Sequence, residues 1–368
     1  MILFAVFFSN LLGLFTKRIQ YLIALLSTTY FIWIASSLQP FLSFDTNVYQ
    51  ETYSFPVSSK VYEVGYLWLS NFFYQNNYSY EQFRLITFIV AYLVFFVAVI
   101  RLTKQVSLFM MLYLFFPFLN DVSNVRNTFM IFIVFLASTF MVKKRNIPIA
   151  VGLILLSTTM QTTGYLYLLS VPLIMLPLKK LIKFSQILLV LAGVVFFMIL
   201  VAGHSSLITN ALVFALSHST RGNIDQMVGA FSGGTLKVRA VGIFLAYLFE
   251  MLVFYRYILK YGYSDQIESK IKIMFVFLVI GMLGVPAVAW NLAFERILRN
   301  TFIFFIGAVS LVLSEKLPDV GLDTHRKNMQ MMMFLVALLI IVEMASQGYF
   351  SMSSGNRGFY VPYMLHWK

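Results

Sequence analysis

The sequence predicts an all-α polytopic membrane protein with about twelve transmembrane helices in a single domain, residues 1–368. The chain is 60% hydrophobic and 11% charged, whereas about 25% of the residues of a soluble domain are charged. Its apolar residues form long runs, and its basic residues gather in short clusters between those runs. Such clusters mark the cytoplasmic side of membrane proteins, so the net charge of +13 requires no nucleic acid as a partner.

Hydropathy places the spans of this fold. Met1–Phe15 lacks a basic leading region and a small-residue cleavage site, so we interpret it as a retained first span rather than a signal peptide. The spans expected in the first half are Ile2–Phe15, Ile19–Leu38, Leu85–Leu102, Ser107–Leu119, Phe129–Val142, Ile147–Met160 and Tyr165–Leu178. Those expected in the second half are Phe184–Ala202, Ala240–Leu259, Ile273–Val288, Thr301–Leu313 and Gln330–Ala345.

The basic clusters follow alternate spans and thereby orient them. Lys17-Arg18, Lys143–Arg145 and Lys260–Lys272 are among the segments that we assign to the cytoplasm. The alternation holds along the whole chain and predicts that both termini lie outside. Of the 27 lysines and arginines, 17 then face the cytoplasm. Two long loops, at about 39–82 and 203–239, face outward.

Some of the expected spans are short. Several have only about 13–16 residues, whereas about 20 are needed to cross a bilayer squarely. The short spans flank three polar places, Asn120–Phe129, Thr158–Gly164 and Trp290–Arg299. Short segments are tolerated where they line a water-filled cavity inside a bundle. The sequence therefore predicts an outward-facing cavity at these three places.

Outer-side arginines are the exceptions to the positive-inside pattern. Arg126, Arg296 and Arg299 stand at span ends, while Arg221 and Arg239 belong to the second outer loop. Guanidinium groups bind phosphate through two parallel hydrogen bonds, so we interpret these arginines as a phosphate-binding set. One alternative is an arginine that extends from a helix end to the interface. The other is an ion pair with a nearby acid, for which the candidates are Asp121, Asp225 and Glu295.

Outer carboxylates are the candidate bases. Asp45 and Glu63 lie in the first outer loop, where either could accept the proton of a sugar hydroxyl. Their alternatives are a helix N-cap for Asp45 and a solvated first-turn acid for Glu63. Glu250 and Glu343 lie within spans, where an acid either has a function or bonds to a neighbouring helix.

No metal or cofactor is expected. Cysteine is absent, which removes disulfides and thiolate sites from consideration. His204 and His218 share the second outer loop without metal-ligand spacing, and we interpret them as solvated. Aromatic residues crowd the first outer loop, and apolar residues at helical spacing predict that Tyr62–Tyr74 lies flat in the outer interface.

Several short motifs, in this order, resemble the EpsG-like group of Wzy-type bacterial polysaccharide polymerases. They are Asp45…Tyr49…Tyr53, Glu63-Val-Gly65-Tyr66, Val125-Arg126-Asn-Thr-Phe, Glu295-Arg296-Ile-Leu-Arg299-Asn-Thr-Phe and Tyr360-Val-Pro-Tyr363. Members of that group usually carry a histidine in the segment that corresponds to Thr158–Gly164. Gln161 stands in its place here.

The resemblance implies an integral-membrane glycosyltransferase, similar to the GT-C class, on the outer face of the cytoplasmic membrane. Its donor and acceptor would be oligosaccharide repeat units linked to undecaprenyl pyrophosphate, joined into an exopolysaccharide, capsule or O-antigen-type polymer with pyrophosphate as leaving group. It would need no nucleotide sugar, and would work in the lipid bilayer beside a chain-length regulator and a flippase. The catalytic candidates are Asp45, Glu63, Arg126 and Arg296; the substrate-binding candidates are Arg299, Arg221, Arg239, Gln161, Tyr360 and Tyr363.

A flippase for lipid-linked oligosaccharides is the alternative from another class, because it would also be basic and polytopic. A flippase should place cationic residues along a central cavity within its spans. The expected spans hold almost no charge, and the outer charges gather at one face. This distribution favours the enzyme. A structural assembly protein without catalysis is a third hypothesis.

Overall fold

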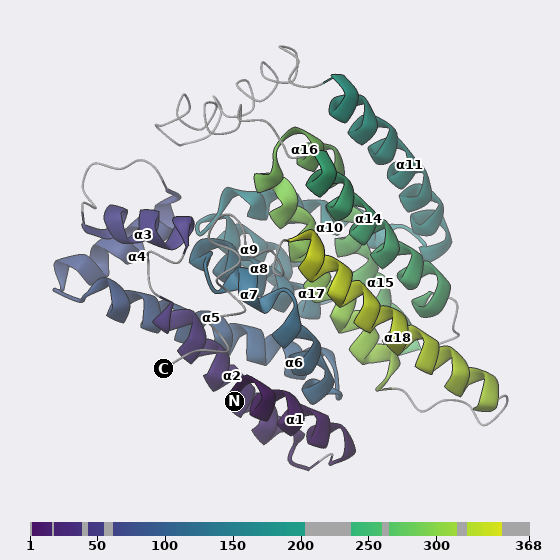
Figure 1. Ribbon diagram of the computed structural model, residues 1–368, viewed down its shortest axis with the longest axis horizontal. Helices are drawn as coiled ribbons and strands as arrows, with labels where there is room; N and C mark the ends of the chain where they lie inside the picture. The colour runs from purple at the N-terminus through teal and green to yellow at the C-terminus, as the bar shows by residue number, and fades with distance from the viewer. Residues whose placement is uncertain are drawn as a thin grey trace.

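The computed structural model describes residues 2–16, 18–38, 43–54, 62–202, 237–259, 265–314 and 322–347, and within them every regular element is a helix (Figure 1). The first half contains α1 (Ile2–Phe15), α2 (Gln20–Ser37), α3 (Phe44–Ser54), α4 (Val64–Gln75), α5 (Tyr80–Leu102), α6 (Val106–Phe115), α7 (Phe118–Asp121), α8 (Val125–Phe140), η2 (Lys144–Asn146), α9 (Ile147–Thr158), η3 (Thr162–Leu169) and α10 (Ser170–Met175). The second half contains α11 (Leu178–Ala202), α14 (Lys237–Val253), η4 (Phe254–Ile258), α15 (Asp265–Gly281), α16 (Gly284–Trp290), η5 (Leu292–Phe294), α17 (Glu295–Val312) and α18 (Leu322–Ser346). The all-helical class is thus confirmed.

Five of the described helical segments are long and apolar enough to cross a membrane. They are Tyr80–Leu102, Leu178–Val201, Lys237–Ile258, Ile267–Trp290 and Arg326–Ser346. Shorter apolar helices occupy Ile2–Phe15, Val106–Phe115, Val125–Phe140 and Thr162–Met175. The chain is therefore a membrane-embedded helical protein, while twelve crossings and a GT-C fold stay predictions.

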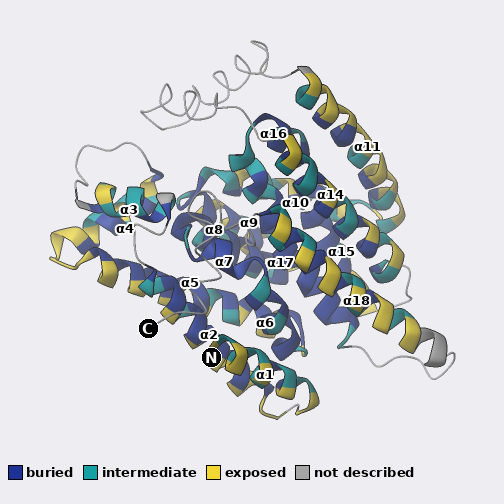
Figure 2. Cartoon of the chain, in the orientation of Figure 1, coloured by how far each residue is buried: buried dark blue, intermediate teal, exposed yellow. Residues whose placement is uncertain are grey.

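Burial separates central helices from peripheral ones (Figure 2). Within Ile267–Trp290, 83% of the most apolar window is buried, against 22% within Leu178–Val201. The helix Leu178–Val201 exposes a continuous apolar face that includes Val190, Met198 and Val201. A helix with such a face suits contact with lipid, whereas α15 suits the centre of a bundle.

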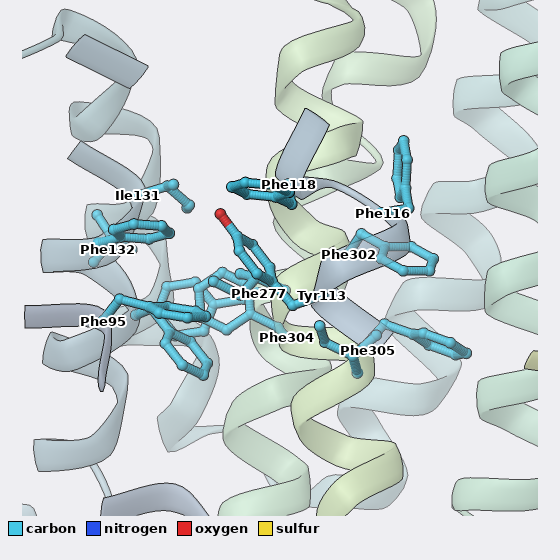
Figure 3. Packing of buried hydrophobic residues seen from close by; sticks show 14 of the residues in the cluster. Phe95, Tyr113, Phe116, Phe118, Ile131, Phe132, Phe277, Phe302, Phe304 and Phe305 are labelled. Atoms are coloured by element: carbon cyan, nitrogen blue, oxygen red, sulfur yellow. The ribbon is translucent and has the colours of Figure 1, made fainter. Parts of the chain in front are cut away.

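Stacked aromatic rings join the two halves of the chain at the centre (Figure 3). Phe277 of α15 and Phe304 of α17 stack with their centroids 4.2 Å apart and their planes 1° from parallel. The ring of Phe135, from α8, meets Phe304 edge-on at 5.4 Å. Aromatic pairs of this kind contribute about 0.5–1.5 kcal/mol beyond the burial of their surface. They fix α8, α15 and α17 against one another.

Several helices begin earlier than the sequence predicts, among them α8 and α17, which carry Arg126 and Arg296. α8 starts at Val125 rather than Phe129, and α17 starts at Glu295 rather than Thr301. Hydropathy excludes polar residues from a span, but these polar side chains have partners inside the protein. The span expected at Ser107–Leu119 is instead interrupted at Pro117, which lacks the N–H that a continuing helix needs.

The first outer loop is largely helical where it is described. α4 takes the place of the helix expected at Tyr62–Tyr74, and Val64, Trp68 and Phe72 form one exposed apolar face on it. These positions repeat every four residues, which is the spacing of one helix face. The face fits the expectation that this helix lies in the membrane interface.

Candidate functional site

A buried ion pair joins the first outer loop to the start of α8. Nη1 of Arg126 lies 2.5 Å from Oε2 of Glu63, and the two side chains are 9% and 3% exposed. Glu63 precedes α4 directly, and Arg126 is the second residue of α8. Two residues that the sequence assigns separately, one to phosphate binding and one to proton transfer, are therefore direct partners.

The backbone of α4 sets the position of Glu63. The N–H groups of Gly65 and Tyr66 both donate to the carbonyl of Thr159, at 2.9 and 3.2 Å. A side chain at Gly65 would meet Oγ1 of Thr159 at 2.4 Å, so only glycine permits this approach. The approach brings Glu63 to Thr162, whose backbone N–H and hydroxyl donate to Oε1 at 2.9 and 3.2 Å. Both oxygens of Glu63 thus have donors.

A chain of hydrogen bonds leads from Arg126 to Asp45. Nε of Arg126 donates to the Tyr49 hydroxyl at 3.3 Å, and that hydroxyl donates to Oδ1 of Asn124 at 3.0 Å. Nδ2 of Asn124 donates in turn to Oδ2 of Asp45 at 3.1 Å. Asp45 is half-buried in α3 and makes no other hydrogen bond within the described part of the chain. Its second oxygen is thus open to another group.

Tyrosine rings surround the guanidinium of Arg126. Its central carbon lies 4.2 Å from the ring centroid of Tyr62, and Tyr49 and Tyr66 lie within 5.8 Å. Burial raises the pKa of Tyr62 to about 12 and also raises the pKa of Tyr49, where the charge of Arg126 acts in the opposite direction. Both phenols stay protonated at neutral pH. They therefore act as ring and hydrogen-bond partners rather than as charges.

Arg296 differs from the other arginines at this end of the molecule. It is half-buried in the first turn of α17, and its Nε donates to the carbonyl of Ala293 at 2.8 Å. The negative charge of Asp45 favours its charged form, whereas the positive charges of Arg299 and Arg126 disfavour it. No described carboxylate lies within ion-pair distance of it, so its two terminal amino groups are available to an anion.

Glu295, the neighbour of Arg296, serves two other arginines instead. Its Oε2 accepts from Arg239 at 3.0 Å, and its Oε1 accepts from Arg299 at 3.4 Å. Adjacent helical residues point about 100° apart, which explains the separation of Glu295 from Arg296. Arg239 and Arg299 thus each pair with Glu295 through one terminal amino group, and Glu295 is one of the acids considered as their partners.

Two asparagines tie the Arg126 helix to the Arg296 helix. The side-chain amides of Asn127 and Asn300 exchange hydrogen bonds of 2.8 and 2.9 Å, and both are buried. Arg84 holds the segment before α8 by hydrogen bonds. Its guanidinium donates to the carbonyls of Leu38 and Val122, at 3.1 and 2.7 Å. These hydrogen bonds fix α8 against α17 and hold the segment that leads into α8.

Gln161 directly precedes Thr162, which donates two hydrogen bonds to Glu63. Its side chain is 3% exposed, and its Oε1 has no hydrogen-bond partner among the described residues. A buried amide oxygen without a partner is uncommon and is open to a donor. The remaining substrate-binding candidates, Arg221, Tyr360 and Tyr363, lie outside the described residues, as does most of the second outer loop.

Sequence reasoning assigned no role to the residues that connect the site. Tyr49 and Asn124 link Arg126 to Asp45, Thr162 holds Glu63, and the Asn127–Asn300 pair links two helices. The polar stretch after Leu119 was a usable signal, because asparagines between apolar segments need buried partners. No pattern in the sequence indicates which partners they find.

The comparisons with known proteins agree with the resemblance seen in the sequence. A family model described as the EpsG family matches residues 21–364. No curated protein and no solved structure matches the chain. The family match extends over nearly all of the sequence, including α3, α8 and α17, which carry the site. The chain belongs to the EpsG family, the family of Wzy-type polysaccharide polymerases.

Proposed function

We propose that this protein polymerises oligosaccharide repeat units linked to undecaprenyl pyrophosphate, on the outer face of the cytoplasmic membrane. Membership of the EpsG family supports a polysaccharide polymerase. The observation that carries the finer proposal is Arg296, whose Nε is fixed on the carbonyl of Ala293 and whose two terminal amino groups have no described acidic partner, while the negative charge of Asp45 favours its charged form. The two terminal amino groups of a guanidinium can bind a pyrophosphate leaving group, and a carboxylate can accept a proton, so this arrangement suits a reaction that releases both.

In the proposed reaction, a sugar hydroxyl of the acceptor attacks the anomeric carbon of the donor. The bond from that carbon to the pyrophosphate oxygen breaks, and the negative charge that develops there is stabilised by Arg296. Asp45 accepts the proton of the attacking hydroxyl through its open oxygen. The products are the lengthened lipid-linked chain and undecaprenyl pyrophosphate.

Arg126 and Glu63 have a positioning role in this proposal. Both oxygens of Glu63 already accept hydrogen bonds, so we assign it to holding Arg126 rather than to accepting a proton. Arg126 adds positive charge beside Arg296, as their mutual repulsion indicates. Its bond to Tyr49 connects that charge to Asp45 through Asn124. Arg299, Arg239, Gln161, Arg221, Tyr360 and Tyr363 are the proposed substrate contacts.

Deletion of the protein should leave single lipid-linked repeat units in the outer leaflet of the cytoplasmic membrane. The measurement is the size and sidedness of the lipid-linked sugar, obtained by extraction and by access of an external hydrolase. Restoring the chain should return long polymer. Units trapped on the cytoplasmic side would instead support the flippase hypothesis, and unchanged polymer would leave only an accessory role.

The proposed sidedness can be tested with reporter tags. Tags within 143–145 and 260–272 should report a cytoplasmic location, because basic loops are retained there. Tags within 205–221 and after residue 368 should report an outside location. A cytoplasmic carboxyl terminus would mean an odd number of spans. It would also reverse the side on which Arg296 and Asp45 work.

A further inference from the structure

A second basic site lies at the far end of the helices that carry the candidate active site. Arg84 and Arg101 stand near opposite ends of α5, 17 residues apart, which corresponds to about 25 Å along a helix. At the Arg101 end a cavity of about 230 Å³ is lined by Arg101, Thr139, Val142, Lys143, Asn146 and Lys270. Three of these six residues are cationic, and none is acidic.

Contacts with neighbouring residues hold two cations of this pocket, Arg101 and Lys270, in place. Nε of Arg101 donates to Oγ1 of Thr139 at 3.1 Å, and its guanidinium lies 4.1 Å from the ring centroid of Phe140. Nζ of Lys270 donates to the carbonyls of Arg101 and Leu102, at 3.3 and 2.6 Å. These contacts use one of the five N–H groups of Arg101 and two of the three on Lys270. The other N–H groups are available to an anion.

Donors without a partner complete the pocket. Lys143 is exposed and Asn146 half-exposed, and neither side chain is hydrogen-bonded to any described residue. Within the same part of the chain, no carboxylate forms an ion pair with Arg101, Lys143 or Lys270. The positive-inside rule explains why basic residues are numerous on this side, because the number of lysines and arginines in a loop sets the orientation of the protein in the membrane. It does not explain their convergence on one cavity.

We propose that this pocket binds a phosphate group at the cytoplasmic face, carried by an anionic phospholipid headgroup or present as soluble phosphate. Basic pockets between transmembrane helices on the cytoplasmic side bind such headgroups. Arg101, Lys143 and Lys270 supply the charge, Asn146 supplies an amide donor, and Val142 gives the cavity an apolar edge. The site is separate from the proposed active site, and only its cytoplasmic location rests on the sidedness proposed above.

The experiment measures thermal unfolding of the full-length protein in lipid nanodiscs. Nanodiscs of phosphatidylcholine alone are compared with nanodiscs that contain increasing phosphatidylglycerol, and a parallel series adds inorganic phosphate to the phosphatidylcholine nanodiscs. A rise in the unfolding temperature with phosphatidylglycerol identifies the headgroup as ligand. A rise with inorganic phosphate identifies the soluble anion.

Two neighbouring lysines provide matched variants. Lys143→Gln removes a charge from the pocket, while Lys144→Gln removes the same charge from an exposed residue that does not line it. Lys143→Gln should weaken the apparent affinity for the phosphate-bearing ligand about five-fold, and Lys144→Gln should leave it unchanged. Arg101→Gln should act like Lys143→Gln, as a second pocket variant.

Two results would overturn the proposal. Equal losses in Lys143→Gln and Lys144→Gln would show a diffuse attraction of the basic surface for anions rather than a site. No rise in the unfolding temperature of the unmodified protein, with either lipid or phosphate, would show that the pocket binds neither. Neither result depends on polymer synthesis, so a failure here is distinct from a failure of the polymerase proposal.

Discussion

Replacement of Arg296 by alanine should reduce polymer formation about 100- to 1,000-fold, the range observed when a donor to developing charge is removed from an active site. Replacement by lysine should be nearly as damaging. Lysine keeps a positive charge but loses both the paired amino groups and the Nε that fixes the side chain on the carbonyl of Ala293. The measurement is a polymer ladder from membranes that contain each variant at matched abundance.

One variant is the control for this prediction, and two others test the roles assigned to Asp45 and Glu295. Lys237→Ala removes an exposed positive charge at the start of α14 and should have little effect on the ladder. Asp45→Asn should lower polymer formation about 100-fold, as the loss of a general base does. Glu295→Gln should lower the amount of folded protein instead, because it weakens the shared acceptor of Arg239 and Arg299. Equal, modest losses at positions 296, 45 and 295 would mean that all three residues are structural.

The fold class could be predicted from the sequence because hydropathy and the alternation of basic clusters are each read over many residues, so no single residue decides them. The residues at which the helices begin could not be predicted in this way, as α8 and α17 show. Hydropathy treats Arg126 and Asn300 as breaks in a span, yet each has a partner from another element, Glu63 and Asn127 respectively. A side chain that is satisfied across the bundle can continue a helix that its own sequence would end.

The sequence indicated candidate arginines but not the partners that the structure gives them. The sequence indicated the arginines because charges are scarce on the outer side, and a single chain cannot show which of them has a partner. The structure divides them: Arg126 pairs with Glu63, Arg239 and Arg299 share Glu295, and Arg296 has no described acid. Glu295 and Arg299 are four residues apart on one helix, a spacing that the sequence shows. The partners in the Arg126–Glu63 and Arg239–Glu295 pairs are 63 and 56 residues apart and come together only through packing of the bundle, which no local spacing reveals.

The Arg126–Glu63 pair should have a structural and a functional role that two kinds of variant can separate. Arg126→Met leaves the buried carboxylate of Glu63 without its cation and should destabilise the protein by about 3–5 kcal/mol. Glu63→Gln should destabilise it for the reciprocal reason. The double variant removes both charges and should recover most of the lost stability, because a buried ion pair contributes little net stability. Thermal unfolding in detergent measures each step.

Polymer formation should not follow the recovery of stability in the double variant. The folded double variant lacks the charge beside Arg296 and the donor to Tyr49, so its ladder should stay as short as that of the single variants. Native-length polymer from it would reduce the pair to a structural contact. Arg126→Lys tests the same point differently. It can still pair with Glu63 and keep the fold, but it has no Nε to donate to Tyr49, so a stable protein without polymer would place the function in the guanidinium itself.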